Sequence, residues 1–568
     1  MRHRSFGMTV LIVISIIVFT LSVWAAWDDN GDIVSWGARN ELDPRIAPDT
    51  TGGAYIAWMQ HFVSSMLDPS IFVQKIDANG NMLWGIGGIM LTEDTTMVWS
   101  PVDIAPDGAG GALVVWSDGR ENLTNSQDIY AQRLDASGNR LWAYWGAEVY
   151  SGLEIQNYPL IVSDEAGGAV IVWRDDASGD DNLRAQRLDA SGARLWTHSG
   201  VLVCDDPSDQ VRHRIASDGA GGVIVVWDDD RVAADWNVYA QRIDASGSIQ
   251  WEPAGIPICT EAGQQTFPQL VSDDAGGAII TWEESSRNGL YAQRVNAGGD
   301  TLWAANGLAV CYNYIGGRTA PQIAPDGSGG AVLCWNDGRT PRGIYAQRVN
   351  ADGDLLWNIN GVSICTAIAT QYDPQIASDG SGGAAIAWQE NRNVSYLGDV
   401  YASTVDAYGN VQGPATGSAV CTNVDNQIEI RIATDGSGGG IISWRDNRDA
   451  AETWNDIYAG RVQFSGATDD GLPESPSATY LSQNYPNPFN PATTIRFNLP
   501  QAAHVRLRVF TIKGELVATL IDRNMTEGFK KVLWAGTDSR NQAVSTGVYF
   551  YQFVAGNFTQ TRKMVLLR

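Results

Sequence analysis

The stretch Asp103-Ile-Ala-Pro-Asp-Gly-Ala-Gly-Gly-Ala-Leu-Val-Val-Trp116 decides the fold, because variants of it recur along the chain. Each copy has a five-residue phrase ending in aspartate, a glycine pair, a short apolar run and a tryptophan. The phrases begin at Arg45, Asp103, Leu160, Arg214, Gln269, Gln322, Gln375 and Arg431, and their tryptophans lie 53 to 58 residues apart at Trp58, Trp116, Trp173, Trp227, Trp282, Trp335, Trp388 and Trp444. A period of this length indicates a repeat architecture.

A second phrase follows in most copies, as in Tyr130-Ala-Gln-Arg-Leu-Asp-Ala-Ser-Gly-Asn-Arg-Leu-Trp142. Each copy divides into four strands: one before the aspartate, one ending near the first tryptophan, one containing Tyr-Ala-Gln-Arg and one containing Leu-Trp. The glycines between them supply the positive φ that tight hairpins need. We therefore predict an all-β chain whose residues 27–466 form an eight-bladed β-propeller of four-stranded blades.

The two ends of the array indicate how the ring closes. The eighth copy ends after Arg461 in a Gly/Asp/Pro/Ser-rich stretch without a fourth strand, whereas residues 29–36, before the first copy, resemble a lone turn and fourth strand. We predict that the N-terminal strand completes the eighth blade. The alternative is an open array, or seven blades with one stray repeat.

The charge excludes one class of partner. The 568 residues contain 64 acidic and 38 basic side chains, a net charge of −26, which opposes binding to nucleic acid. At the N-terminus, Arg2-His3-Arg4 precedes an apolar run from Met8 to Val23 and the small residues Ala25-Ala26. This layout predicts a signal peptide over residues 1–26, cleaved near Ala25 or Ala26, and an uncleaved anchor is the alternative. We expect no stable membrane span after cleavage.

The C-terminal part has a different composition. A linker is expected over 467–478, and residues 479–568 hold eleven basic and four acidic residues within alternating strands. This pattern predicts a small Ig-like β-sandwich.

Four segments of this part carry a resemblance: Asn484-Tyr-Pro-Asn-Pro-Phe-Asn-Pro491, Lys513-Gly-Glu-Leu-Val517, Ser545-Thr-Gly-Val-Tyr-Phe550 and Lys563-Met-Val-Leu-Leu-Arg568. Together they resemble the type A sorting domain of type IX secretion, which is similar to Ig-like FlgD/Vpr modules. The resemblance implies export by the type IX machinery across the outer membrane of a Gram-negative bacterium. Release or surface attachment would follow. An ordinary Ig-like module without an export role is the alternative.

The loops after the second and fourth strands differ between copies, and in such a blade both emerge on one face, which is the expected binding face. Aromatic residues in these loops are the candidate ligand contacts: Tyr158, Trp236, Phe267, Tyr312, Tyr314, Tyr396 and Trp454. Their apolar faces beside polar neighbours suit sugar rings. Aromatic residues that pack only on their own loops are the alternative.

Acidic loops offer oxygen ligands for Ca²⁺, although neither of the two main clusters matches an EF-hand. The candidate metal ligands are Asp175, Asp176, Asp180, Asp181, Asp228, Asp229 and Asp230, and residues 28–32 form a similar but shorter cluster. Solvated turn residues are the alternative, so no cofactor is predicted beyond possible calcium.

Recurring acid–arginine pairs, such as Asp118 with Arg120 and Asp229 with Arg231, are interpreted as structural, because one active site does not need several copies of its parts. The six cysteines are expected to be buried thiols, because equivalent places on neighbouring blades lie too far apart for disulfides.

No nucleophile or phosphate-binding motif occurs. We therefore predict a secreted or cell-surface binding protein that recognises a polysaccharide or a surface protein without catalysis. The alternatives are a glycan-processing hydrolase or lyase that uses loop carboxylates, and a structural component of the cell surface.

Overall fold

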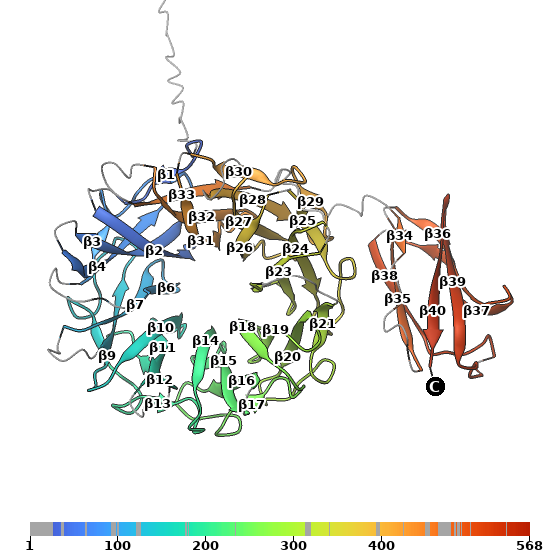
Figure 1. Ribbon diagram of the computed structural model, residues 1–568, viewed down its shortest axis with the longest axis horizontal. Coiled ribbons are helices and arrows are strands. Elements are labelled where there is room, and N and C mark those ends of the chain that lie inside the picture. The colour runs from blue at the N-terminus through green and yellow to red at the C-terminus, as the bar shows by residue number, and fades with distance from the viewer. Residues whose placement is uncertain are drawn as a thin grey trace, which may run out of the picture.

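The chain folds into a ring of β-sheets and a β-sandwich (Figure 1). The computed structural model describes residues 27–567 except 36–38, 63–64, 93–97, 99–100, 121–126, 177–178, 180, 233–234, 313–319, 340, 368, 393–397, 424, 449–454, 464–478, 482–483, 485–488, 490, 500, 527 and 541. The described residues contain strands and turns but no helix. Eight of their sheets form the ring, which confirms the predicted eight-bladed propeller.

Within each blade the strands follow one another from the ring centre outward. Blades 1 to 4 consist of β2 (Arg39–Pro48), β3 (Ala54–Phe62), β4 (Ser65–Ile76) and β5 (Ile89–Met90); β6 (Asp103–Pro106), β7 (Ala112–Asp118), β8 (Asp128–Leu134) and β9 (Ala147–Tyr150); β10 (Gln156–Ser163), β11 (Ala169–Asp175), β12 (Asn182–Leu188) and β13 (Val201–Leu202); and β14 (Gln210–Ser217), β15 (Val223–Val232), β16 (Asp235–Ile243) and β17 (Ile256–Pro257).

Blades 5 to 8 repeat this order, and the last takes its outer strand from the N-terminus. They consist of β18 (Gln265–Ser272), β19 (Ala278–Glu284), β20 (Gly289–Val295) and β21 (Leu308–Cys311); β22 (Gln322–Pro325), β23 (Ala331–Asp337), β24 (Gly343–Val349) and β25 (Val362–Cys365); β26 (Gln371–Ser378), β27 (Ala384–Glu390), β28 (Asp399–Val405), β29 (Val411–Gln412) and β30 (Ser418–Cys421); and β31 (Gln427–Thr434), β32 (Gly440–Asp446), β33 (Asp456–Val462) and β1 (Asp32–Ile33).

The core lies between the blades rather than inside each one. Every residue of β7 is buried, so both faces of its sheet need cover. Trp116 of blade 2 packs in one cluster with Tyr55 of blade 1, and Trp282 of blade 5 packs with Val226 of blade 4. Neighbouring blades therefore bury the apolar faces that a single four-stranded sheet would expose.

In blades 1 to 6 the fourth strands lie later in the chain than expected. In blade 2 the predicted fourth strand contained Leu141-Trp142, but the strand observed there is β9, Ala147–Tyr150. The buried Gln132 causes the displacement: its Oε1 accepts the N–H of Trp142 at 3.0 Å and its Nε2 donates to the carbonyl of Ala143 at 2.6 Å. These two bonds replace ladder pairing and hold the Leu-Trp segment in a turn.

The same segment links each blade to the next. Seven tryptophans, called here the outer tryptophans, donate their Nε1–H to the carbonyl of an alanine one blade further on, at 3.0 to 3.2 Å: Trp27, Trp84, Trp142, Trp196, Trp251, Trp303 and Trp357. Trp27 belongs to the N-terminal segment and reaches Ala78 of blade 1. It therefore supplies the outer tryptophan of blade 8.

The N-terminal segment closes the ring through β1. Asp32 pairs with Ala459 and Ile33 with Tyr458 of β33. Arg461 of the same strand donates to the carbonyl of Ala78 at 3.2 Å, as Trp27 does. The segment predicted as a lone fourth strand, residues 29–36, thus forms the outer edge of blade 8, although Trp36 lies outside the described residues.

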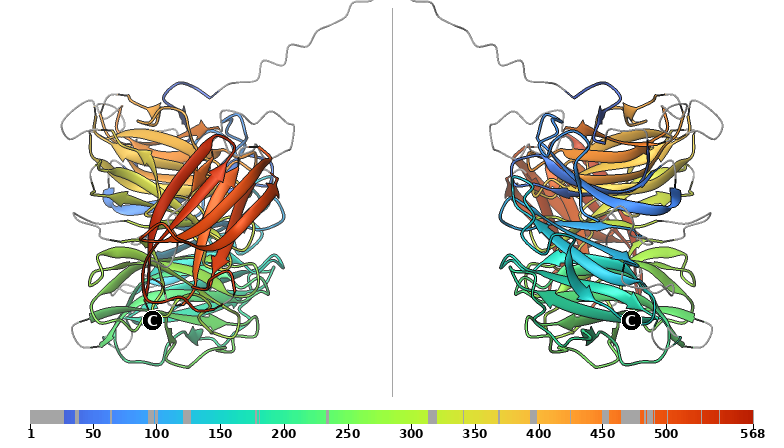
Figure 2. Two further views of the ribbon diagram at one scale, coloured as in Figure 1. Left: turned by 90° about the vertical axis from the view of Figure 1, so that its right-hand side faces the viewer. Right: turned by 90° about the vertical axis from the view of Figure 1, so that its left-hand side faces the viewer.

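The C-terminal module is a two-sheet sandwich, as predicted. One sheet contains β34 (Tyr480–Leu481), β35 (Thr493–Leu499) and β38 (Gly528–Trp534), and the other contains β36 (Ala503–Thr511), β37 (Leu516–Met525), β39 (Gly547–Ala555) and β40 (Phe558–Leu566). Figure 2 shows their strands from the side. Phe497 and Phe553 meet between the sheets, with ring centroids 4.6 Å apart.

Candidate ligand-binding site on the loop face

The loops that follow the second and the fourth strands meet on one face of the ring. At blades 3 and 4, the N–H of Gln210 donates to the carbonyl of Asp181, and the N–H of Asp181 donates to Oδ1 of Asp209 at 2.9 Å. At blades 7 and 8, the N–H of Gln427 donates to the carbonyl of Gly398. The face expected to bind ligand is therefore one surface built by neighbouring blades.

Three neighbouring inner strands each carry a bulge at this face. Their pairing registers shift at Tyr158, Arg212 and Phe267, which adopt φ of 52°, 51° and 58°. A bulge re-aims a side chain out of the ladder. Tyr158 is 50% exposed and the Arg212 side chain 45% exposed, so equivalent positions of blades 3, 4 and 5 present unlike groups to solvent.

Arg212 joins two of the predicted aromatic residues. Its guanidinium lies 4.8 Å from the ring centroid of Phe267 and 5.9 Å from that of Trp236. Asp228 anchors this guanidinium from below, with Oδ2 2.7 Å from Nη1. Burial raises the pKa of Asp228 to about 6, against the opposing effect of its bond to Arg212. The result is a rigid cluster of two rings around a half-exposed cation.

A second aromatic–arginine pair lies beside this cluster, in blade 3. The Arg174 guanidinium lies 4.7 Å from the ring centroid of Tyr158. Arg174 also donates to Asn157 at 2.9 Å and forms an ion pair with Asp181 at 3.1 Å. Burial raises the pKa of Asp181. These contacts fix the orientation of the half-exposed tyrosine.

Of the other predicted aromatic residues, the structure describes only Tyr312. Tyr312 is 40% exposed in the loop after β21, where its N–H donates to Asn360 of blade 6. Tyr314, Tyr396 and Trp454 lie outside the described residues. The structure therefore brings together Trp236 and Phe267, with Tyr158 on the adjoining blade.

Most of the candidate calcium ligands that the structure describes have other partners. Asp175 pairs with Arg184, Asp228 with Arg212, and Asp229 with Arg231. Asp230 accepts the N–H of Asp209, Asp176 and Asp181 lie in the neighbouring loop, and Asp180 lies outside the described residues. Within the described part of the chain, no group of three or more His, Cys, Asp or Glu residues is placed to hold a metal.

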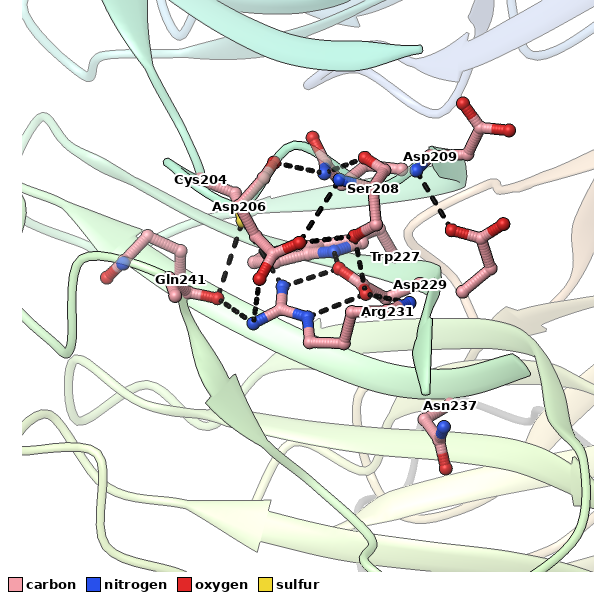
Figure 3. A network of polar contacts seen from close by, with 12 residues as sticks. Cys204, Asp206, Ser208, Asp209, Trp227, Asp229, Arg231, Asn237 and Gln241 are labelled. Atoms are coloured by element: carbon pink, nitrogen blue, oxygen red, sulfur yellow. Dashed lines mark hydrogen bonds and ion pairs between the residues drawn. The ribbon is translucent and has the colours of Figure 1, made fainter. Parts of the chain in front are cut away.

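The recurring acid–arginine pairs form a structural module, shown for blade 4 in Figure 3. Asp229 accepts the Nε1–H of Trp227 at 2.8 Å and forms an ion pair with Arg231. The guanidinium of Arg231 lies 3.9 Å from the ring centroid of Tyr239. Arg231 also donates to the carbonyl of Ala254 at 2.8 Å and to Sγ of Cys204. The module joins the second, third and fourth strands, so it holds the blade together. All six cysteines are buried thiols.

A cavity of about 910 Å³ lies at the ring closure. Its lining includes Asp28, Asp32, Ile86, Arg448 and Tyr458. Burial raises the pKa of Asp32, with the charge of Asp28 adding to the effect. The short acidic cluster at residues 28–32 therefore borders this cavity.

Sequence reasoning missed one set of residues near the candidate site. The first residue of each repeated phrase occupies the same register of the inner strand, opposite the residue directly before the tryptophan of the second strand, as in Arg214 opposite Val226, which precedes Trp227. The other phrase positions hardly change, but this one is Arg, Asp, Leu or Gln. Variation at this one position of an otherwise constant phrase was the sequence signal that could have identified these residues.

Comparison with known proteins identifies the C-terminal module. Residues 483–567 match the family of secretion system C-terminal sorting domains. The module is a sorting domain. In it the N–H of Asn484 donates to the hydroxyl of Tyr551, and Phe489 pairs with the final strand, so both of these residues are bound to the sandwich core. The sorting domain makes this a secreted or cell-surface protein that uses the type IX machinery.

The remaining comparisons concern the fold alone. Solved structures similar to this chain include puromycin hydrolase (13% identity, TM-score 0.40, covering 74% of this chain and 61% of that one). They include PorZ, a surface component of the type IX secretion system of Porphyromonas gingivalis (9%, 0.23, 95% and 100%), and a PL25 ulvan lyase (11%, 0.36, 62% and 90%). The chain thus spans about three-fifths of the length of puromycin hydrolase. A search of curated protein sequences finds no match.

No helix of the described residues is long and apolar enough to cross a bilayer.

Proposed function

We propose that this protein is exported by a Gram-negative bacterium and binds a polysaccharide on the loop face of its propeller, without catalysis. The observation that carries the proposal is the cluster of Arg212, Trp236 and Phe267, whose half-exposed cation is held between two rings by the buried Asp228. Aromatic faces stack on the apolar faces of sugars, and a fixed guanidinium donates to hydroxyl or acidic groups at the sugar edge. Such a site is pre-organised, which lowers the entropic cost of binding.

The test is a panel of immobilised polysaccharides, with and without calcium, in which both retained protein and released sugar are measured. The full chain is expected to be retained by at least one polysaccharide with no sugar released. A double variant, W236A/F267A, should be retained at least ten-fold less well. Tyr312→Ala is the matched control, because that side chain is exposed on the same face but lies outside the cluster.

The other outcomes separate the rival functions. Release of sugar would contradict a binding role and support a glycan-processing enzyme. Absence of both retention and release would direct attention to a surface protein as the partner. Retention that depends on calcium would support the loop aspartates as calcium ligands.

A further inference from the structure

The centre of the ring contains a set of arginines that the blade modules do not use. Arg45, Arg214 and Arg431 come from the inner strands of blades 1, 4 and 8, at equivalent registers opposite Ala57, Val226 and Ser443. Inner strands of successive blades contact one another around the ring, as Figure 1 shows. Arg214 is exposed and the other two are partly exposed, so solvent reaches all three.

These arginines differ in their partners from the arginines on the third strands of the blades. Each donates from Nη1 to the carbonyl of the residue before it, at 3.2 Å in Arg45, 2.9 Å in Arg214 and 2.7 Å in Arg431. Arg214 also donates from Nε to Gln269 of blade 5 at 3.1 Å. Among the described residues, none of the three has a carboxylate within ion-pair distance, whereas Arg133, Arg187, Arg242, Arg294, Arg348 and Arg461 all do.

Arg45 also repels each of the other two cations. Loss of hydration, followed by the charge of Arg45, lowers the pKa of Arg214, and the same two causes lower the pKa of Arg431 to about 10. Asp103 of blade 2 is the acidic member of the same register and accepts the N–H of Ile161 at 3.0 Å. Near Arg431, Glu429 forms an ion pair with Arg445 and accepts the N–H of Asp43. These carboxylates therefore have other partners.

We infer that the centre of the ring binds an anionic group of the ligand, a carboxylate or a sulfate ester, between Arg45, Arg214 and Arg431. Three guanidinium groups pre-oriented by backbone carbonyls match an anion with several oxygens better than a neutral hydroxyl. The anion would take the ion-pair position that no carboxylate of the described residues occupies at these three arginines. Since Arg212 of the loop-face cluster and Arg214 share one strand, this inference rests on the proposed function and specifies its ligand as an acidic polysaccharide.

The experiment titrates the full chain with four probes: polygalacturonate, dextran sulfate, neutral dextran and inorganic sulfate. Binding is measured by calorimetry and by the shift in melting temperature. We expect at least one of the two acidic polymers to bind and neutral dextran not to, and inorganic sulfate to raise the melting temperature. The stronger of the two acidic polymers distinguishes a carboxylate ligand from a sulfate ester. Arg214→Gln and Arg45→Gln should each lower the affinity for that polymer about ten-fold or more.

The matched control is Arg194→Gln, which removes one positive charge from a pair with Glu148 elsewhere on the propeller and should leave affinity unchanged. Melting temperatures in low salt show whether each variant folds, and removing one of the repelling cations should not lower them. Equal affinity of Arg214→Gln, Arg45→Gln and the unchanged chain would overturn the inference.

Its failure is distinguishable from failure of the proposed function. Sulfate-dependent stabilisation that Arg214→Gln abolishes, without retention by any polysaccharide, would sustain the central anion site and contradict the glycan proposal. Equal retention on neutral and acidic polymers would contradict the central anion site and sustain the glycan proposal.

Discussion

Arg231 holds several groups of blade 4 together, and its loss should cost more than the loss of a surface ion pair. The Asp229 side chain is fully buried against it, with Trp227 donating to the same carboxylate. Removing one partner of a buried pair leaves an uncompensated charge, so Arg231→Ala should lower the free energy of unfolding by about 3 kcal/mol or more. Urea unfolding measures this loss. Arg194→Ala, whose ion pair with Glu148 is partly exposed, should cost about 1 kcal/mol or less, and equal losses would contradict the structural role.

His213 lies between Arg212 and Arg214 and is buried. Burial, followed by the charge of Arg214, lowers its pKa from 6.5 to about 3. Below pH 6.5 this histidine therefore binds a proton in the unfolded chain but not in the folded chain. As the pH falls from 6.5 to about 3, it lowers the free energy of unfolding. The slope is up to about 1.4 kcal/mol per pH unit.

His213→Gln should flatten the pH dependence of unfolding in that interval by this amount. Urea unfolding at several pH values tests this prediction. Subtracting the values of the unchanged chain from those of the variant cancels the contribution of the many carboxylates, which both chains share. His504→Gln, at a half-exposed histidine of the sorting domain, should follow the unchanged chain. Identical slopes in all three chains would show that His213 takes up its proton in the folded state.

At the scale of the element, the outer tryptophans explain two substitutions in blade 7. Where the other blades have the Arg of Tyr-Ala-Gln-Arg (Lys75 in blade 1) and the outer tryptophan, blade 7 has Thr404 and Gly413. In the other blades, most of these arginines and the outer tryptophans donate to the carbonyl of an alanine in the turn between the third and fourth strands of the next blade. Blade 8 has no such turn, because its fourth strand comes from the N-terminus. Both donors are lost where their acceptor is missing.

Removing the closing strand should destabilise the whole ring. In a chain produced without residues 1–26, deletion of residues 27–35 uncovers β33 and exposes the buried Val34 cluster. The melting temperature should fall by more than about 5 °C. Trp27→Phe is the graded control, because it removes only the bond to Ala78 and should cost about 1 kcal/mol. An unchanged melting temperature after deletion would mean that the ring is stable without β1.

The repeat predicted the number of blades and their strand order because glycine pairs and tryptophans occur once per blade. It misplaced the fourth strand, since the bonds of Gln132 to Trp142 and Ala143 belong to tertiary structure. It also gave Trp27 no role, because the hydrogen bond to Ala78 exists only in the closed ring. The pairing of Arg212 with Trp236 and Phe267 depends on bulges that alternation cannot predict.

At the scale of the whole molecule, the sorting domain determines where the propeller functions. Its +7 charge contrasts with the −26 of the chain, and Phe489 pairs with Leu566 of its last strand. A chain ending at residue 478 should remain inside the cell envelope of a host with type IX machinery, since the domain that the machinery uses is gone. Immunoblots of medium, cell surface and periplasm measure this. Tyr312→Ala, which leaves the domain intact, should be exported normally, and export of the truncated chain would contradict the role of the domain.

The split eighth blade also sets an order of events during synthesis. Asp32 emerges from the ribosome early, but its partner Ala459 follows only after more than four hundred further residues. At roughly 5–20 residues per second, the N-terminal strand waits on the order of tens of seconds for a place to bind. During that time it is available to whatever recognises a nascent N-terminus. A chain terminated early would keep an unpaired first strand, so the ring closes only after all eight blades have been made.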